Sequence, residues 1–149
     1  HTDVLFDDRL VAIARVDHPV FSGVLSLDSL RAGSFVMLRR RTTDIERIRP
    51  YQSWLALNLK TVLEVSELLE ILLVVCQSDL FGVMMESMAN ATKESLKVRV
   101  LTIPRWETEP IPVRMIWHPR RDADPAHLFL RTQLKCVVQE ILSTSAKQS

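Results

Sequence analysis

Short strand-like segments that alternate with helix signals limit the folds open to this chain. Segments with the length and apolar pattern of strands occur at residues 10–14, 35–38, 57–65, 80–84, 97–103 and 113–117. Helix signals occur at residues 43–48, 66–76, 87–94 and 125–142. Strands that alternate with helices at this spacing predict an α/β fold with a mostly parallel sheet flanked by helices.

The size and charge of the chain narrow its class. Its 149 residues are 47% hydrophobic and 25% charged, which is typical of one globular domain. The net charge of +1 gives no general attraction to nucleic acid or to an anionic membrane. The charge is unevenly spread, because residues 31–60 carry seven basic and two acidic side chains, whereas residues 61–96 carry one and six. A block of +5 is therefore followed by a block of −5.

Nothing in the sequence indicates export or a membrane anchor. The longest apolar run, Ile71 to Cys76, is far shorter than the roughly 20 residues of a membrane span, and the first residues, HTDVLFDD, do not resemble a signal peptide. Cys76 and Cys136 lie in apolar runs without the spacing of a metal site, which predicts buried, reduced thiols. These features favour a cytoplasmic protein that makes no contact with a membrane.

The helix signal is clearest near the end of the chain. Asp124 is placed to cap a helix in which Pro125 takes the first position. An apolar stripe then follows at helical spacing, formed by Leu130, Leu134, Val137, Val138 and Ile141. We therefore expect an amphipathic helix that needs a cover for one face.

The residues that catalysis requires are not arranged in a recognisable pattern. The four histidines, His1, His18, His118 and His127, are far apart, and no metal-binding spacing joins them. The neighbouring carboxylates of Asp7 and Asp8 fit a solvated turn better than an acid-base pair. The sequence therefore predicts no catalytic residue, no metal site, no cofactor and no enzymatic activity.

Four segments resemble, in their order and spacing, the effector-binding domain of LysR-type transcriptional regulators. They are LFDDRLVAIARVDHP at residues 5–19, LSLDSLRAGSFVML at 25–38, LKTVLEVSELLEILLVVCQSDLFGVMMESMANA at 59–91 and IWHPRRDADPAHLFLRTQL at 116–134. The resemblance covers nearly the whole chain and depends on the order of the segments. It implies a lobe of the type II periplasmic-binding-protein fold, together with part of a first lobe.

The resemblance also implies a domain organisation. Residues 15–116 would form the second lobe, and residues 1–14 and 117–149 would supply crossover strands and the last helix of the first lobe. A winged helix-turn-helix and half of the first lobe would precede His1, so contact with DNA would occur only through that absent domain. Two other functions stay open on the sequence alone, because a solute-binding protein of a transport system shares this architecture and a small α/β enzyme has a similar pattern.

Two segments are candidates for binding a small-molecule effector. Ligands of open α/β sheets collect at the carboxyl ends of strands, and a helix start offers free N–H groups to an anion. An organic anion held by arginines and by the helix start would use Leu38, Arg39, Arg40, Arg41, Thr42, Val65, Ser66 and Glu67. The alternatives are a solvated basic loop at residues 39–41 and an ordinary N-cap at Ser66.

The helix predicted after Ser66 carries only one polar residue, Glu70, between Leu68 and Cys76. A helix that is apolar on nearly every side must be covered twice, once by its own sheet and once by another surface. The resemblance implies that subunits pair through this helix. We therefore expect a homo-oligomer whose interface includes Leu68, Leu69, Leu72, Leu73, Val75 and Cys76.

Overall fold

The computed structural model describes residues 1–19, 26–39, 54, 56–101 and 110–146, with side chains described as far as residue 143. These residues form two compact units, and each is described by itself. One unit is the continuous segment 9–110, and the other combines residues 1–8 with residues 111–149. The sequence predicts lobe limits near residues 15 and 116, whereas the contacts divide the chain several residues earlier on both sides. The helix expected at residues 43–48 lies outside the described residues.

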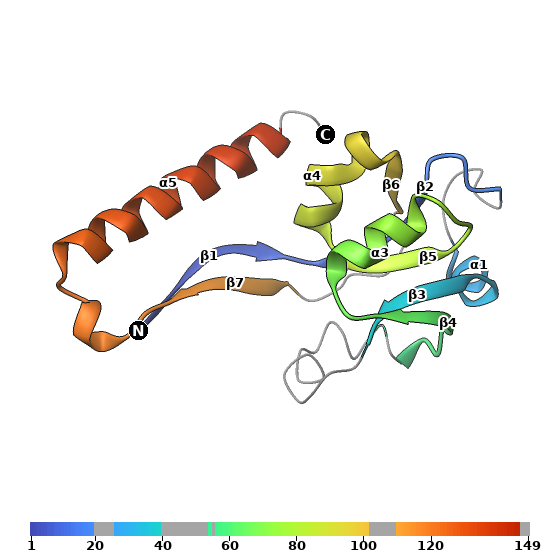
Figure 1. Ribbon diagram of the computed structural model, residues 1–149, viewed down its shortest axis with the longest axis horizontal. Helices are drawn as coiled ribbons and strands as arrows, with labels where there is room; N and C mark the ends of the chain where they lie inside the picture. Colours follow the sequence, from blue (N-terminus) through green and yellow to red (C-terminus); the bar gives the residue numbers. More distant parts are fainter. Residues whose placement is uncertain (20–25, 40–53, 55, 102–109, 147–149) are drawn as a thin grey trace. The chain divides into compact units, whose positions relative to one another are not determined.

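The larger unit contains a five-stranded sheet in the order β4-β3-β5-β2-β6 (Figure 1). The strands are β2 (Leu10–Arg15), β3 (Ser34–Leu38), β4 (Lys60–Val65), β5 (Phe81–Met85) and β6 (Val98–Leu101). Strands β4, β3 and β5 are parallel, while β2 is antiparallel to both β5 and β6. The predicted α/β class is confirmed, but the sheet is mixed, because β2 is inserted in the opposite direction between two strands that share a direction.

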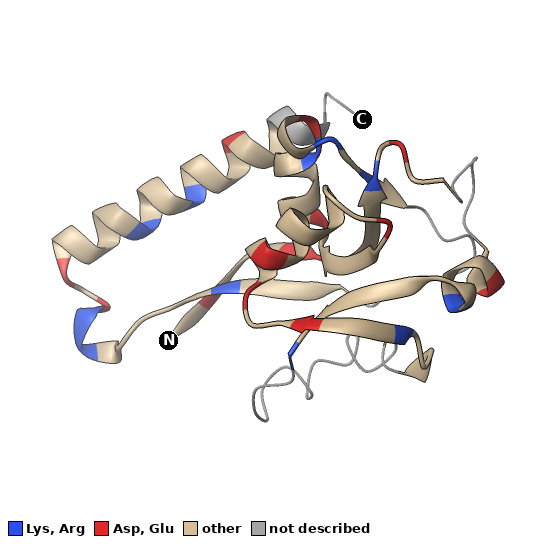
Figure 2. Ribbon diagram, turned by 45° about the vertical axis from the view of Figure 1, so that its right-hand side comes forward, with Lys and Arg blue, Asp and Glu red and all other residues tan. Residues whose placement is uncertain are grey.

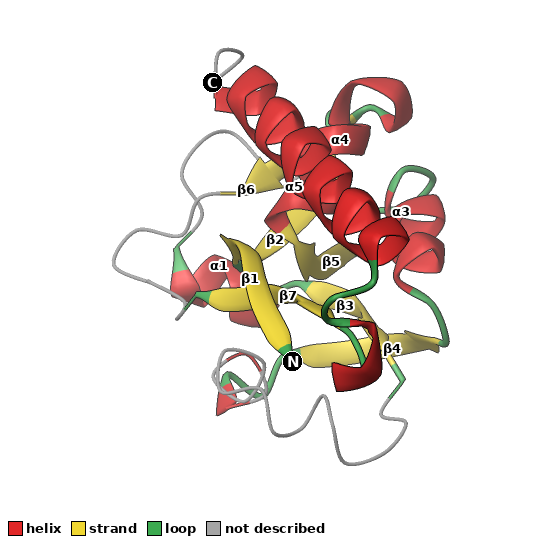
Figure 3. Ribbon diagram, turned by 90° about the vertical axis from the view of Figure 1, so that its left-hand side faces the viewer, coloured by secondary structure: helices red, strands yellow, loops and turns green. Residues whose placement is uncertain are grey.

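Two helices cover one face of this sheet (Figure 3). Helix α3 (Leu68–Val75) packs on β5 and β3, and α4 (Glu86–Leu96) packs on β6 and β5. The core between the helices and the sheet consists of Val11, Ile13, Val36, Ile71, Leu72, Val75, Met84, Ala89 and Val98. A third, short helix, α1 (Leu27–Ala32), begins at Ser26, whose Oγ accepts a hydrogen bond of 3.1 Å from the N–H of Ser29.

A glycine sets the close approach of α3 to the sheet. A Cβ at Gly82, in β5, would lie 2.5 Å from Cγ2 of Ile71 and 3.0 Å from Cγ2 of Val75. Both contacts are shorter than the van der Waals distance of carbon atoms, about 3.5 Å or more. Glycine at this position therefore lets the helix pack directly on the backbone of the strand.

His18 is a structural residue of the larger unit. Its side chain is buried, and Nε2 lies 3.0 Å from the carbonyl oxygen of Asp79. The imidazole also packs against the ring of Phe81, with 4.4 Å between the centroids.

The smaller unit is built from both ends of the described chain. Strand β1 (Thr2–Asp8) pairs with β7 (Ile111–Ile116) in antiparallel register, and α5 (Pro125–Ala146) follows a short 3-10 turn, η2 (Pro119–Arg121). An ion pair between Lys135 and Asp3 joins α5 to β1. The solvated turn expected at Asp7 and Asp8 is wrong, because both residues belong to β1 and Asp8 is buried.

Helix α5 begins as the sequence predicts. The carboxylate of Asp124 accepts a hydrogen bond of 3.0 Å from the N–H of Ala126, and Pro125 takes the first helical position. Charged residues are sparse along this helix (Figure 2). Its apolar stripe is exposed within the described residues, with exposed fractions of 60% at Leu130 and 58% at Ile141. Cys136 is exposed as well, so its predicted burial is wrong.

No helix among the described residues is long and apolar enough to cross a membrane.

Candidate functional site

The two segments predicted to bind a ligand meet at the carboxyl ends of two neighbouring parallel strands. In the β3-β4 register Leu38 lies beside Val65, and the N–H of Arg39 donates a hydrogen bond of 2.6 Å to the carbonyl of Val65. Leu38 and Arg39 are therefore adjacent to the start of α3. Three further predicted residues, Arg40, Arg41 and Thr42, lie outside the described residues.

A carboxylate of the protein occupies the start of α3. Oε2 of Glu70 accepts hydrogen bonds from the N–H of Ser66, at 2.7 Å, and from the N–H of Glu67, at 3.0 Å. The N-cap is Glu67, so the capping role expected for Ser66 is wrong by one residue. Glu67 and Glu70 form the reciprocal capping arrangement, but a glutamate stands where serine or threonine is usual, so the sequence signal for this cap is weak.

A third parallel strand, β5, ends on the same side of the sheet as β3 and β4, next to an ion pair that no sequence pattern predicts. β5 ends at Met85, and the next residue, Glu86, accepts two hydrogen bonds of 2.6 Å from Nε and Nη2 of Arg9. The N–H of Glu86 also donates to the carbonyl of Arg9, at 2.8 Å. Arg9 and Glu86 are 77 positions apart, so no local pattern could have linked them.

Three carboxylates lie in or beside the start of α3, those of Glu64, Glu67 and Glu70. Among the described residues, Arg39 brings a positive charge to the same place, while the predicted Arg40 and Arg41 lie outside them. An anionic ligand would therefore compete with Glu70 for the N–H groups of Ser66 and Glu67. This competition would make the site selective, because a ligand could bind at the N-terminus of α3 only if it replaced both hydrogen bonds of Glu70.

The histidines of the described chain serve separate local structures. Nδ1 of His1 lies 3.1 Å from Oδ1 of Asp122, and Nδ1 of His118 accepts a hydrogen bond of 3.1 Å from the N–H of Arg120. Within the described ranges no group of three or more His, Cys, Asp or Glu side chains is arranged to hold a metal ion.

The residues expected at a subunit interface divide into two groups. Leu72 and Val75 are fully buried in the core of their own unit, so these two side chains are not accessible to a partner. Leu69 and Leu73 are 55% and 48% exposed on the opposite side of α3. The remaining two, Leu68 and Cys76, are partly buried against the core.

A comparison with models of protein families identifies the family of this chain. The model described as the LysR substrate binding domain matches residues 1–139. The chain belongs to this family. A comparison with curated proteins finds no similar sequence.

Solved structures of several transcriptional regulators share the fold. A probable transcriptional regulator from Pseudomonas aeruginosa is 22% identical, with a TM-score of 0.72, and the match covers 91% of this chain and 44% of that protein. A putative regulator from Vibrio parahaemolyticus is 19% identical, with a TM-score of 0.74 and coverage of 96% and 66%. The regulatory domain of MexT, a transcriptional activator from Pseudomonas aeruginosa, is 18% identical, with a TM-score of 0.71 and coverage of 91% and 66%.

The LysR-family chain therefore spans less than two thirds of the length of each of these three proteins. Membership of the LysR substrate binding domain family disfavours the solute-binding protein of a transport system that the sequence alone left open.

Proposed function

We propose that this chain is the ligand-sensing part of a LysR-type transcriptional regulator, and that it acts on a DNA-binding domain outside the 149 residues. The observation that carries the proposal is the family match over residues 1–139. A relative from Synechocystis, 14% identical and with a TM-score of 0.70, has a regulatory domain solved in complex with 2-PG. We propose an equivalent sensing role here, without catalysis, in the cytoplasm.

The proposed effector is a small organic anion bound at the carboxyl ends of β3 and β4. The backbone hydrogen bond from the N–H of Arg39 to the carbonyl of Val65 supports this placement, because it fixes the backbone of a basic residue beside the start of α3. The effector carboxylate would pair with Arg39 and take the two N–H groups that Glu70 now occupies. Displacement of Glu70 would change the cap of α3 and so connect ligand binding to the helix.

A calorimetric screen of aromatic and aliphatic carboxylates on the intact regulator tests this site. For a confirmed effector, Arg39→Ala should weaken binding roughly tenfold, which corresponds to one lost charge-assisted contact. The matched control is Arg31→Ala, which removes an exposed arginine from α1. Equal affinity of the parent and Arg39→Ala would place the effector elsewhere while leaving the regulatory role intact.

The chain alone should not bind DNA with useful affinity. Its net charge is +1, and duplex DNA binding depends on the neutralisation of several phosphates by basic side chains. A gel-shift titration of the 149-residue chain should show no sequence-selective complex at sub-micromolar protein. A salt-dependent and selective shift would contradict the assignment of DNA contact to another domain.

A further inference from the structure

An open groove follows β6, the edge strand at the other end of the sheet from β4. Its volume is about 560 Å³, and we call it the β6 groove. Val16, Lys93, Glu94, Lys97, Val98, Arg99 and Val100 line it. Three of these side chains are cationic and one is anionic, so the lining has a net positive charge.

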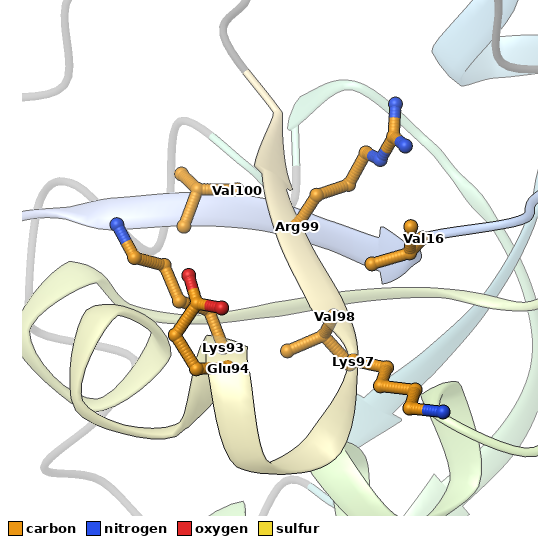
Figure 4. Close-up of a pocket in the computed structure, with 7 residues that line it drawn as sticks. All are labelled: Val16, Lys93, Glu94, Lys97, Val98, Arg99 and Val100. Carbon is orange, nitrogen blue, oxygen red and sulfur yellow. The ribbon is translucent and has the colours of Figure 1, made fainter.

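The cations lie on both sides of the strand. Figure 4 shows Lys93 and Glu94, from α4, on the side toward which Val98 and Val100 point. Lys97 and Arg99 project from the other side of β6 in the same view. A compact anion would meet only one of these groups. An extended chain beside β6 would reach both, because successive side chains of a strand point to opposite faces of the sheet.

The position of β6 permits such a chain. β6 is last in the order β4-β3-β5-β2-β6, and no strand among the described residues pairs with it except β2. An edge strand offers a row of backbone donors and acceptors to another strand. Basic side chains beside the edge repel a second copy of the same edge and attract a segment with acidic side chains. The charge of the groove therefore favours an acidic segment over a second copy of β6.

The groove wall is held in place before any ligand arrives. Lys97 has φ 51° and ψ 43°, in the left-handed region that favours glycine, and it closes α4. Its N–H donates to the carbonyl of Lys93, and its own carbonyl accepts a hydrogen bond of 2.8 Å from the N–H of Val16. Within the described residues neither Lys93 nor Lys97 forms an ion pair with a carboxylate of the chain. Two lysine charges are thus available to a ligand from a fixed backbone.

We propose that the β6 groove binds an acidic peptide segment in extended conformation, which adds a strand to the sheet beside β6. Backbone hydrogen bonds supply the pairing, and carboxylates on alternate faces meet Lys93 on one side and Lys97 and Arg99 on the other. The ligand is a segment of a protein partner, and it is separate from the small effector proposed at β3 and β4.

Fluorescence polarisation with a labelled peptide tests the proposal on the 149-residue chain. The probe is Thr-Val-Glu-Glu-Val-Glu-Glu-Thr, in which adjacent glutamates place carboxylates on both faces of a strand. We expect saturable binding that weakens as salt rises, and no binding of the peptide with glutamine at each glutamate position. The double variant Lys93→Glu, Lys97→Glu should weaken binding at least about tenfold. The matched control, Lys60→Glu, changes an exposed lysine on the opposite edge strand, β4, and should bind as the parent does.

Two further measurements separate strand addition from general charge attraction and from misfolding. Lys97→Gly removes a cation but favours the left-handed backbone, so it should raise the melting temperature and still weaken peptide binding. A peptide with N-methyl groups on alternate residues of its pairing edge retains all its carboxylates but loses the backbone donors, and it should not bind. Equal binding of the methylated and unmethylated peptides would overturn the proposal, as would unchanged affinity in Lys97→Gly or the absence of binding by the acidic peptide.

Discussion

The carboxylate of Glu70 reaches back over the first turn of α3 and accepts a hydrogen bond of 2.7 Å from the N–H of Ser66. The carboxylate therefore occupies the N-terminus of α3, where a ligand anion could otherwise bind. The same carboxylate also accepts from the N–H of Glu67, so one side chain satisfies two backbone donors.

Glu70→Ala should therefore have two opposite effects. The free energy of unfolding should fall by about 1 kcal/mol, because the cap of α3 is lost. The affinity for an anionic effector should rise, because the N–H groups of Ser66 and Glu67 no longer have a competing carboxylate. Urea denaturation and calorimetry measure the two quantities. Glu64→Ala is the control, since it removes an exposed carboxylate from the neighbouring strand β4 without touching the cap. A loss of effector affinity in Glu70→Ala would mean that Glu70 itself binds the effector.

Gly82→Ala should destabilise the larger unit by about 1–3 kcal/mol, because a new Cβ cannot fit 2.5 Å from Cγ2 of Ile71. Chemical denaturation measures the change. The variant Ile71→Ala removes the clashing methyl group, so the double variant should be less destabilised than the sum of the two single variants. Additive effects would show that α3 does not pack on Gly82 as described.

Leu73→Glu should reduce self-association if the exposed side of α3 contacts a partner, because Leu73 is 48% exposed there. Sedimentation velocity at several concentrations checks this outcome. The neighbouring variant Leu72→Ala is the comparison, since Leu72 is fully buried and its truncation should instead lower stability by about 2–5 kcal/mol. If Leu73→Glu sediments as the parent does at every concentration, the interface lies on another surface.

The ion pair between Asp3 and Lys135 should make the smaller unit sensitive to acid. The hydrogen bond and the charge of Lys135 lower the pKa of Asp3 below its usual value of 3.8. A carboxyl with a depressed pKa stabilises the fold above its unfolded pKa, and this stabilisation is lost as the pH falls through the folded pKa. The difference in melting temperature between the parent and Asp3→Asn should therefore shrink as the pH falls below 3.8. Lys135→Gln breaks the same pair and should show the same trend, whereas a difference that stays constant with pH would contradict this account.

Thiol labelling should distinguish the two cysteines. Cys136 is exposed on α5, whereas Cys76 is partly buried and its Sγ lies 3.3 Å from the carbonyl of Leu73. A maleimide reagent should therefore modify Cys136 first in the native chain, as peptide mapping by mass spectrometry would reveal. Faster labelling of Cys76 would show that α3 opens more readily than its packing indicates.

The sequence predicted helices and strands well where the local signals agree with one another. Asp124, Pro125 and the stripe that follows predicted α5 because capping and periodicity agree there. The adjacency of Arg39 and Val65 was also predictable, since the carboxyl ends of consecutive parallel strands share an edge. Local patterns are strong predictors in these cases because the determining residues are close in the sequence.

Other features depended on information that a local pattern does not contain. Only Glu70 is polar between Leu68 and Cys76, so the sequence did not indicate that Leu72 faces the core while Leu73 faces outward. The direction of β2 was also hidden, because its apolar run is equally compatible with parallel and antiparallel neighbours. Tertiary packing decided both.

The smaller unit closes only when the two ends of the described chain meet. Thr2 pairs with Ile116, whereas the larger unit is the single continuous segment 9–110. During synthesis the larger unit can therefore fold as soon as its own residues have left the ribosome. β1 has to wait for β7, whose residues are made more than a hundred positions later, and its closure is a long-range and intrinsically slow step.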